Sequence, residues 1–193
     1  MLKKNLEKYY CFINDINNEI KNNILKFKNI SLIYRPTQQQ LNNLNFVEIK
    51  KFCKKNSIKL YGYDNHKIVT KNNLQGLVVS SHYKRQIINP YFKDKFKLIG
   101  IAHNQIEYFN KYKQGCSVIM LSPLFYNKKF SLNKILSPIK FKLITSNWKT
   151  DICALGGLNL NNIKKLKLIK LDAIGFCSLI STQKIKKPAD FLK

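Results

Sequence analysis

Two glycine-containing loops late in the sequence have residue types that can bind an anion. The first, Ala-Leu-Gly-Gly-Leu-Asn at 154–159, follows an apolar run, and the second is Gly-Phe-Cys-Ser-Leu-Ile at 175–180. Glycine lets backbone N–H groups approach an anion closely, and the first turn of a following helix adds unpaired donors and a partial positive charge. Either loop alone could be a plain strand-to-helix turn. Together they predict a phosphate-binding site.

A third candidate for chemistry is His103, which directly follows the apolar run 98–102. An imidazole with an unperturbed pKa of about 6.5 can accept and deliver a proton at neutral pH. His103 could instead cap the following helix or pack at a rim, which is the more common role of a single histidine. His66 and His82 have no partner spacing that indicates a metal site, so we expect them on the surface.

Short apolar runs must position these residues, and segments of helical periodicity separate the runs. The runs that we predict as strands are 9–13, 30–34, 58–61, 77–80, 98–102, 118–121, 152–155 and 173–177. The segments that we predict as helices include 16–27, 41–55 and about 104–114. Strands that are apolar on both faces and alternate with helices are typical of a parallel sheet covered by helices.

About eight such units predict the α/β class and a single (β/α)₈ TIM barrel, which we expect to be one domain over residues 1–193. The alternative is an open doubly wound sheet, but the sequence contains no obvious G-x-G-x-x-G to support it. The stretch 123–150 departs from the alternation, because Pro123 and Pro138 accompany only a weakly marked helix. It could be an active-site flap or a decorated surface loop.

The formal charge of +25 over 193 residues invites a nucleic-acid interpretation. However, the basic residues are spread along the whole chain and are almost all lysine, and Asn, Ile, Phe and Tyr accompany them, as an A/T-rich coding sequence would produce. No platform of aromatic and basic residues is visible. Nucleic-acid binding is therefore the least favoured function, although a basic surface would still attract phosphorylated substrates.

The cysteines and the apolar runs indicate a soluble, cytoplasmic protein without a membrane segment. The five cysteines are odd in number, far apart and never in a C-x-x-C pair, a pattern that fits reduced thiols in core positions. The first residues lack the apolar core of a signal peptide, and no apolar run approaches the roughly 20 residues that span a bilayer.

The sequence resembles the thiamine phosphate synthase/TenI family of small (β/α)₈ barrels over nearly its whole length. Four motifs in the same order and strand context carry the resemblance. They are Ile-Gly-Ile-Ala-His-Asn at 99–104 for the family's G-x-S-x-H-S, Leu-Ser-Pro-Leu-Phe at 121–125 for G-P-V-F, residues 154–159 for A-I-G-G-I-N, and Cys-Ser-Leu-Ile at 177–180 for V-S-A-I.

The resemblance implies one of two activities. Thiamine phosphate synthases join a pyrimidine carried as its diphosphate to a phosphorylated thiazole and release diphosphate with the help of Mg²⁺. TenI-type members isomerise a thiazole tautomer with a histidine as the proton carrier, which would be His103 here. The residues that would hold the thiazole phosphate through backbone amides are Gly156, Gly157, Ser178 and Leu179.

Several family motifs are altered. The Q-x-R-x-K pattern after the second strand keeps only Arg35, which we predict to be catalytic, and the Asn-Asp pair after the third strand keeps only Asp64, the candidate Mg²⁺ ligand. No acidic residue follows the fourth strand at 78–83. The T-x-T-K diphosphate loop is replaced by a segment in which Lys128 and Lys129 retain positive charge for a diphosphate.

We therefore predict a synthase-like transferase of thiamine biosynthesis that condenses hydroxymethylpyrimidine diphosphate with thiazole phosphate. The alternatives are a TenI-type tautomerase and a non-catalytic barrel that kept the phosphate pocket and lost the metal site. The expected partners are the phosphorylated thiazole and pyrimidine, and a homo-oligomer is compatible with the sequence.

Overall fold

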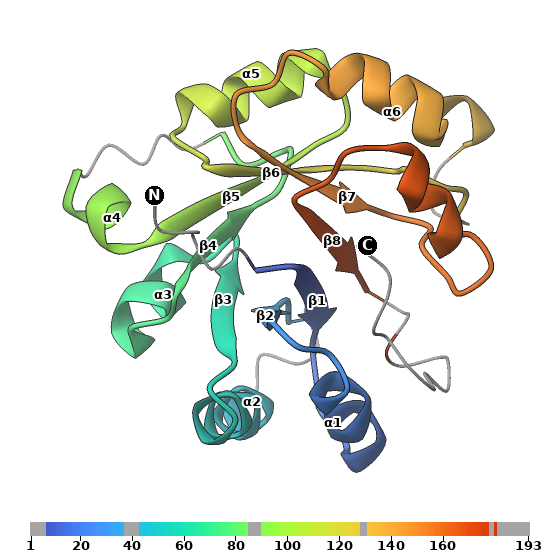
Figure 1. The fold of residues 1–193 in the computed structure, drawn as a ribbon. Coiled ribbons are helices and arrows are strands. Elements are labelled where there is room, and N and C mark those ends of the chain that lie inside the picture. The colour runs from blue at the N-terminus through green and yellow to red at the C-terminus, as the bar shows by residue number, and fades with distance from the viewer. Residues whose placement is uncertain (1–6, 37–42, 85–89, 128–130, 178–179, 181–193) are drawn as a thin grey trace, which may run out of the picture.

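Parallel pairing in sequence order closes the strands into a barrel. The computed structural model describes residues 7–36, 43–84, 90–127, 131–177 and 180. Within them each strand pairs with the next, and β8 pairs with β1 (Figure 1). The strands are β1 Tyr9–Ile13, β2 Ile30–Tyr34, β3 Lys59–Tyr63, β4 Gly76–Val79, β5 Lys97–Ala102, β6 Val118–Leu121, β7 Asp151–Leu155 and β8 Ala173–Phe176. The predicted (β/α)₈ barrel is confirmed.

Helices surround the barrel on its outer side (Figure 1). They are α1 Asn18–Leu25, α2 Asn43–Lys55, α3 His66–Asn72, α4 Pro90–Lys95, α5 Gln105–Lys113 and α6 Ser137–Thr145, with the 3₁₀ helices η2 Leu132–Lys134 and η3 Ile163–Leu168. Asparagine begins three of them, because the side chains of Asn17, Asn65 and Asn104 each accept a hydrogen bond from a backbone N–H three residues further on.

Alternation along the strands divides the core into two layers. One set of side chains points outward to the helices, and the other fills the barrel interior. The buried interior residues are Tyr10, Phe12, Ile33, Tyr61, Val78, Ile99, Ile101, Val118, Met120, Cys153, Leu155 and Ala173. Because side chains fill the interior, a binding site must be built at an end of the barrel.

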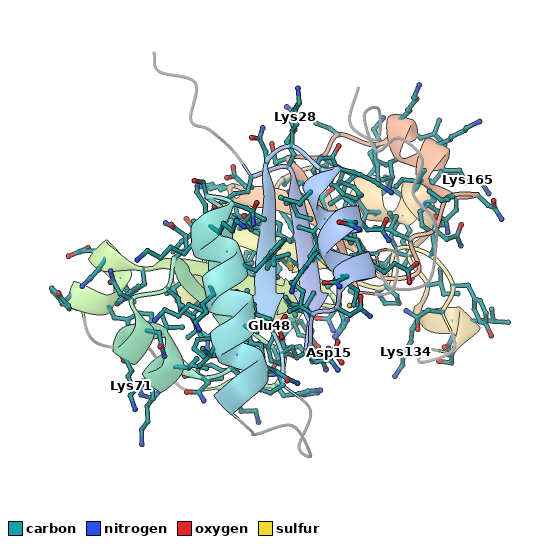
Figure 2. All side chains as sticks on the ribbon, turned by 90° about the horizontal axis from the view of Figure 1, so that it is seen from below. Asp15, Lys28, Glu48, Lys71, Lys134 and Lys165 are labelled. Carbon is teal, nitrogen blue, oxygen red and sulfur yellow. The ribbon has the colours of Figure 1, made fainter. Side chains whose placement is uncertain are left out.

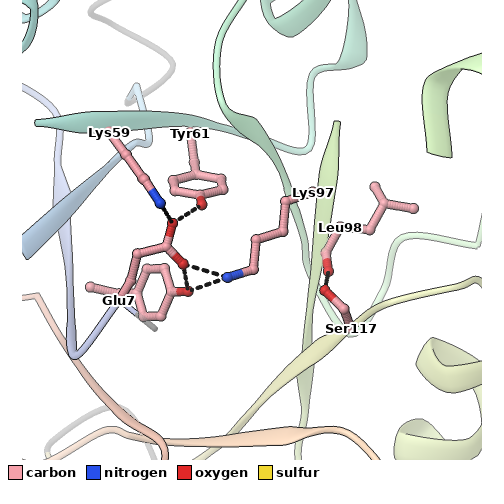
Figure 3. Close-up of polar contacts among 7 residues, drawn as sticks. Glu7, Lys59, Tyr61, Lys97, Leu98 and Ser117 are labelled. Atoms are coloured by element: carbon pink, nitrogen blue, oxygen red, sulfur yellow. Dashed lines mark hydrogen bonds and ion pairs between the residues drawn. The ribbon is translucent and has the colours of Figure 1, made fainter. Parts of the chain in front are cut away.

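The N-terminal end of the barrel is closed by the carboxylate of Glu7, which is only 6% exposed (Figure 3). The hydroxyl groups of Tyr10 and Tyr61 donate to it over 2.8 and 2.6 Å. Lys59 Nζ lies 3.0 Å from Glu7 Oε1, and Lys97 donates to Oε2. Lys59 and Lys97 are the first residues of β3 and β5. The cluster therefore links the N-terminal ends of these strands, the end of a barrel whose residues contribute to stability.

The stretch 123–150 contains a complete helix, α6, where the sequence indicated only a weak one. Its residues Phe141 and Thr145 are buried. Ile139 and Leu143, however, are 76% and 71% exposed. Apolar side chains therefore lie on several sides of α6, and this arrangement removes the one-sided pattern by which a helix is recognised in a sequence.

The cysteines and charges mostly follow the sequence-based expectation. Cys11, Cys53, Cys116 and Cys153 are buried free thiols, whereas Cys177 is exposed, so the expected core position is wrong for that residue. Lysines extend from different sides of the barrel (Figure 2). No helix in the described part of the chain is long and apolar enough to cross a membrane.

Candidate active site

The candidate residues that the structure describes all lie at the C-terminal ends of strands. Arg35 directly follows β2 and its N–H donates to Ile13 O, Asp64 follows β3, and His103 follows β5. Gly156 and Gly157 follow β7. A parallel barrel brings these positions to one rim, where barrel enzymes build their active sites. Ser178, Leu179, Lys128 and Lys129 lie outside the described residues.

The Gly156–Gly157 loop is joined to the loop after β6. Leu124 N–H donates to Leu155 O and Phe125 N–H donates to Gly156 O, over 2.9 and 3.1 Å. Gly157 has a φ of 70°, and a Cβ atom at this position would lie 2.2 Å from Phe125 O. Both the left-handed backbone and the close approach require glycine here.

Two asparagines hold this loop from its other side. Asn162 Nδ2 donates to Gly157 O over 2.7 Å, and Asn162 Oδ1 accepts from Asn159 N–H over 2.9 Å. Asn159 Oδ1 in turn accepts from the N–H groups of Asn161 and Asn162. Asn162 was not among the residues predicted from the sequence, although the short spacing from the glycine pair to two asparagines was a usable signal.

The segment after the glycine pair differs from the expected strand-to-helix turn. The following helix is η3, a 3₁₀ helix that begins at Ile163, six residues beyond Gly157. Within the intervening turn, asparagine side chains accept from the N–H groups of Asn159, Asn161 and Asn162. The short helix that follows the loop therefore begins at Ile163 and not directly after Gly157.

His103 is fixed at the rim by contacts with two neighbouring segments. Its N–H donates to Glu107 Oε2 over 2.8 Å, and its Nδ1 lies 2.7 Å from Ser122 O. A carbonyl oxygen only accepts, so Nδ1 is the donor in this contact and the imidazole ring is oriented by Ser122 O. The N-cap of α5 is Asn104, whose side chain accepts from Glu107 N–H over 2.9 Å. The alternative role of His103 as the helix cap is therefore wrong.

Asp64 is tied to the loop after β4. Its N–H donates to Val78 O over 2.9 Å, and its Oδ1 accepts from Ser80 N–H over 2.7 Å. Its φ is 49°, a left-handed conformation that aspartate adopts more readily than most residues. Oδ1 of Asp64 therefore already accepts a hydrogen bond that holds the loop, and a ligand at this carboxylate would share it.

Arg35 lies against the residue that precedes Asp64. Its guanidinium carbon is 4.7 Å from the centre of the Tyr63 ring, within the range of a cation–π contact. Burial of Tyr63 raises the pKa of its hydroxyl, so Tyr63 is neutral at physiological pH. The rim therefore has a stacked cation beside a carboxylate-bearing turn, a pairing suited to a charged ligand.

A buried lysine, which the sequence analysis missed, supports the loop after β4. Lys111 in α5 is 1% exposed, and its Nζ donates to Tyr83 O over 2.9 Å and to Gln114 Oε1 over 3.1 Å. Gln114 Nε2 also donates to Tyr83 O. Burial lowers the pKa of Lys111. One partner, Tyr83 O, is a backbone oxygen 28 residues away in the sequence, so spacing alone gave no signal for this contact.

The donor set limits what kind of Mg²⁺ site the rim can form. In the portion of the chain that the structure covers, no group of three His, Cys, Asp or Glu residues could hold a metal. Mg²⁺ is commonly bound by one or two carboxylates together with phosphate oxygens and waters. Asp64 therefore suits a Mg²⁺ ion that arrives with a diphosphate and does not suit a resident, protein-held metal.

The chain is similar to thiamine phosphate synthases in sequence and in fold. It is 25% identical over 175 residues to the thiamine-phosphate synthase of Pelagibacter ubique (strain HTCC1062), covering 88% of this chain and 84% of that protein. The thiamine phosphate pyrophosphorylase from Pyrococcus furiosus superposes with a TM-score of 0.71 at 13% identity, covering 92% of this chain and 88% of that one. The corresponding enzyme from Bacteroides thetaiotaomicron gives 0.59 at 11%, covering 90% and 83%.

No protein-family model matches the chain. The solved structures, at these identities, show the fold alone. The chain is thus a (β/α)₈ barrel with its candidate residues on the C-terminal rim. The curated relative, matched over most of both lengths, makes it similar in sequence to a thiamine-phosphate synthase at low identity.

Proposed function

We propose that this protein is a thiamine phosphate synthase-like transferase that condenses hydroxymethylpyrimidine diphosphate with thiazole phosphate. The observation that carries the proposal is the likeness to a thiamine-phosphate synthase over 88% of the chain. The common location of Arg35, Asp64, His103 and the Gly156–Gly157 loop at one rim supports it. Binding of two phosphorylated substrates needs a cation, a carboxylate that can contact a metal ion, and a loop whose backbone amides can bind a phosphate.

The residues divide the work between the two substrates. The Gly156–Gly157 loop, with Ser178 and Leu179, binds the thiazole phosphate through backbone amides. Arg35, with Lys128 and Lys129, faces the diphosphate and stabilises the negative charge that develops on it as its bond to the pyrimidine methylene carbon breaks. The new bond forms between that carbon and the thiazole nitrogen, so one bond replaces another and diphosphate leaves.

Asp64 would help to hold a Mg²⁺ ion that arrives with the diphosphate substrate, and the bound ion would supply charge neutralisation for the leaving group. The turn after β3 holds this carboxylate because Ser80 N–H and Val78 O fasten it to the neighbouring strand end. Tyr63 carries the Arg35 guanidinium on its ring. The Arg35 guanidinium and the Asp64 carboxylate are thus held by two residues that are adjacent or near in the fold, Tyr63 and Ser80. Neither group needs an ion pair with the other to stay in place.

One contact favours a second candidate function, a TenI-type thiazole tautomerase. The Nδ1 of His103 lies 2.7 Å from Ser122 O, which orients an imidazole ring of the kind that carries protons in general acid–base catalysis. A tautomerase needs such a proton carrier and no diphosphate site. The reduced set of carboxylates at this rim suits that simpler requirement.

An assay of both reactions with the purified full chain separates these functions. Formation of thiamine phosphate from the two substrates, with diphosphate released in equal amount, would support the synthase. Isomerisation of the thiazole phosphate without coupling would support the tautomerase. If neither reaction occurs while calorimetry detects binding of thiazole phosphate, the proposal of catalysis is wrong and the non-catalytic barrel is the better account.

A further inference from the structure

A groove on the outer surface of the barrel is lined by apolar and basic residues that have no role in the proposed catalysis. It lies between α2 and α3 and has a volume of about 680 Å³. Apolar side chains line it, namely Tyr34, Phe46, Val47 and Ile68. Five lysines also line it, Lys50, Lys51 and Lys54 from α2 and Lys67 and Lys71 from α3. The groove is therefore an apolar trough with a basic border.

The lysine density of this groove exceeds the background of a lysine-rich chain. Lysine and arginine together make up 35 of the 193 residues, whereas among the twelve described residues that line the groove five are lysine and none is acidic. Glu48 of α2 is directed to α1, where its Oε1 lies 2.6 Å from Lys21 Nζ. Among the lining residues that the structure describes, no carboxylate compensates the lysines.

Four of the five lysines are also arranged in two pairs that line the same groove. Lys50 and Lys54 are four residues apart on α2, and Lys67 and Lys71 are four residues apart on α3, so each pair lies on one face of its helix. Like charges at this spacing destabilise a helix slightly. All five side chains are exposed, and an anionic ligand would turn this mutual repulsion into attraction.

The floor of the groove favours aliphatic side chains over bases. Val47 is 43% exposed, whereas Tyr34 and Phe46 are 4% and 7% exposed and pack on each other with ring centres 5.0 Å apart. Stacking of nucleic-acid bases needs accessible aromatic faces, and these two rings are covered. An inserted Leu or Ile side chain could instead bury apolar surface over Val47 and the half-buried Ile68.

We propose that the α2/α3 groove, defined by the apolar floor and the five lysines above, binds an acidic amphipathic helix of another protein. Such a helix inserts its apolar stripe into the trough and places carboxylates beside the lysines on both borders. A second copy of this chain is a poor occupant, because two chains of formal charge +25 repel each other. The proposal is independent of the catalytic function.

The test uses a fluorescein-labelled 16-residue helical peptide with leucines at i, i+4, i+7 and i+11 and glutamates on both flanks. Its binding to the full chain is followed by fluorescence anisotropy. We expect the triple variant Lys50→Glu/Lys54→Glu/Lys71→Glu to weaken binding by at least about ten-fold, since it reverses both borders. The control Lys113→Glu/Lys140→Glu/Lys142→Glu changes the net charge equally on exposed positions of α5 and α6 and should change the affinity less than about two-fold.

Two further arms distinguish the groove from general attraction to a polycation. A scrambled peptide of equal composition lacks the leucine stripe and should bind at least about ten-fold more weakly, and Val47→Asn, which keeps the charge, should weaken the intact peptide. Equal losses in the two triple variants, equal binding of both peptides, or no binding of the peptide would overturn the proposal. Tighter binding of a single-stranded oligonucleotide at the same lysines would also overturn it. Circular dichroism of each variant checks that the fold is retained.

Discussion

His103 Nδ1 lies 2.7 Å from the carbonyl oxygen of Ser122, so the ends of β5 and β6 are connected through the imidazole ring. Glu107 accepts from the His103 N–H and fixes the backbone of the same residue. The ring orientation therefore depends on two segments that the barrel places side by side. A histidine held in this way keeps one tautomer, which is the arrangement that proton transfer requires.

The first prediction concerns the tautomerase function of His103. Removing a general acid–base group typically costs about 10²–10⁴-fold in rate, so His103→Ala should lower thiazole isomerisation by that order. Binding of thiazole phosphate should barely change, since its phosphate is proposed to lie on the loops after β7 and β8. Initial rates and calorimetry measure the two effects. His66→Ala, in α3, is the control, and a fully active His103→Ala protein would exclude the tautomerase.

A second prediction compares two glycines with left-handed backbones. Gly157 and Gly115 have φ values of 70° and 88°. A Cβ atom on Gly157 would lie 2.2 Å from Phe125 O, whereas the nearest atom to one on Gly115 is a side-chain carbon of Lys93 at 3.6 Å. Both alanine variants bear the conformational cost of about 1 kcal/mol, but only Gly157→Ala also forces the loops after β6 and β7 apart.

We therefore expect Gly157→Ala to abolish binding of thiazole phosphate and Gly115→Ala to leave it unchanged. Calorimetry gives the affinities, and thermal unfolding reports how much stability each variant loses. Because the clash at Gly157 is with backbone, this variant should also lose more stability than Gly115→Ala. Unchanged thiazole phosphate affinity in Gly157→Ala would remove this loop from the proposed phosphate site.

The third prediction concerns Asp64 and the diphosphate substrate. Asp64→Asn keeps an oxygen that can accept from Ser80 N–H, and asparagine tolerates the φ of 49°. The loop should therefore stay in place while the charge that contacts Mg²⁺ is lost. We expect coupling to fall by about 100-fold, which corresponds to about 2.7 kcal/mol of barrier. Asp15→Asn, at an exposed position, is the control.

The assay for Asp64 is run with Mg²⁺ and with excess chelator. Wild-type coupling should need the metal, and the affinity of Asp64→Asn for Mg²⁺ in the presence of diphosphate should fall in parallel with its rate. Coupling that proceeds equally well in chelator would show that the assigned metal role is wrong. Isomerisation by His103, if present, should not respond to this substitution.

The barrel was readable from the sequence because its strands are apolar on both faces. The bounds of β1, β2 and β6 agree with the predicted runs 9–13, 30–34 and 118–121. The sequence also placed the described candidate residues at one rim, since their positions follow strands. The helix α6 was recognised only weakly, because two exposed aliphatic side chains masked its buried face.

The connections within the rim were largely hidden in the sequence, although the two asparagines after the glycine pair were a usable signal for one of them. Asn162 and Lys111 donate hydrogen bonds to the backbone carbonyl oxygens of Gly157 and Tyr83. Every residue has such an oxygen, so the residue type does not show which one is bound. The requirement for glycine at 157 likewise comes from Phe125 O, an atom of a different loop. Such contacts depend on how two loops meet, which is decided by the packing of the whole barrel.

At the opposite end of the barrel, Glu7 has an unusual titration. Burial of its carboxyl alone would raise the pKa, but hydrogen bonds from Lys97 and Tyr61 and the charge of Lys97 outweigh burial and lower the pKa from 4.5 to about 2. A carboxyl with a depressed pKa in the folded state stabilises the fold above its unfolded pKa. That stabilisation is lost as the pH falls from about 4.5 through about 2.

The last prediction is that Glu7→Gln destabilises the barrel in a pH-dependent way. At pH 7 the variant should lose on the order of 3 kcal/mol of unfolding free energy, because the Lys97 and Lys59 ammonium groups lose their carboxylate. The difference from wild type should shrink between pH 5 and about 2, where the wild-type carboxyl also becomes neutral. Urea unfolding of both proteins across this range measures the difference, and Glu48→Gln, which breaks the exposed Lys21 pair, is the control. A difference that is independent of pH would mean that packing of the side chain, and not its charge, closes this end of the barrel.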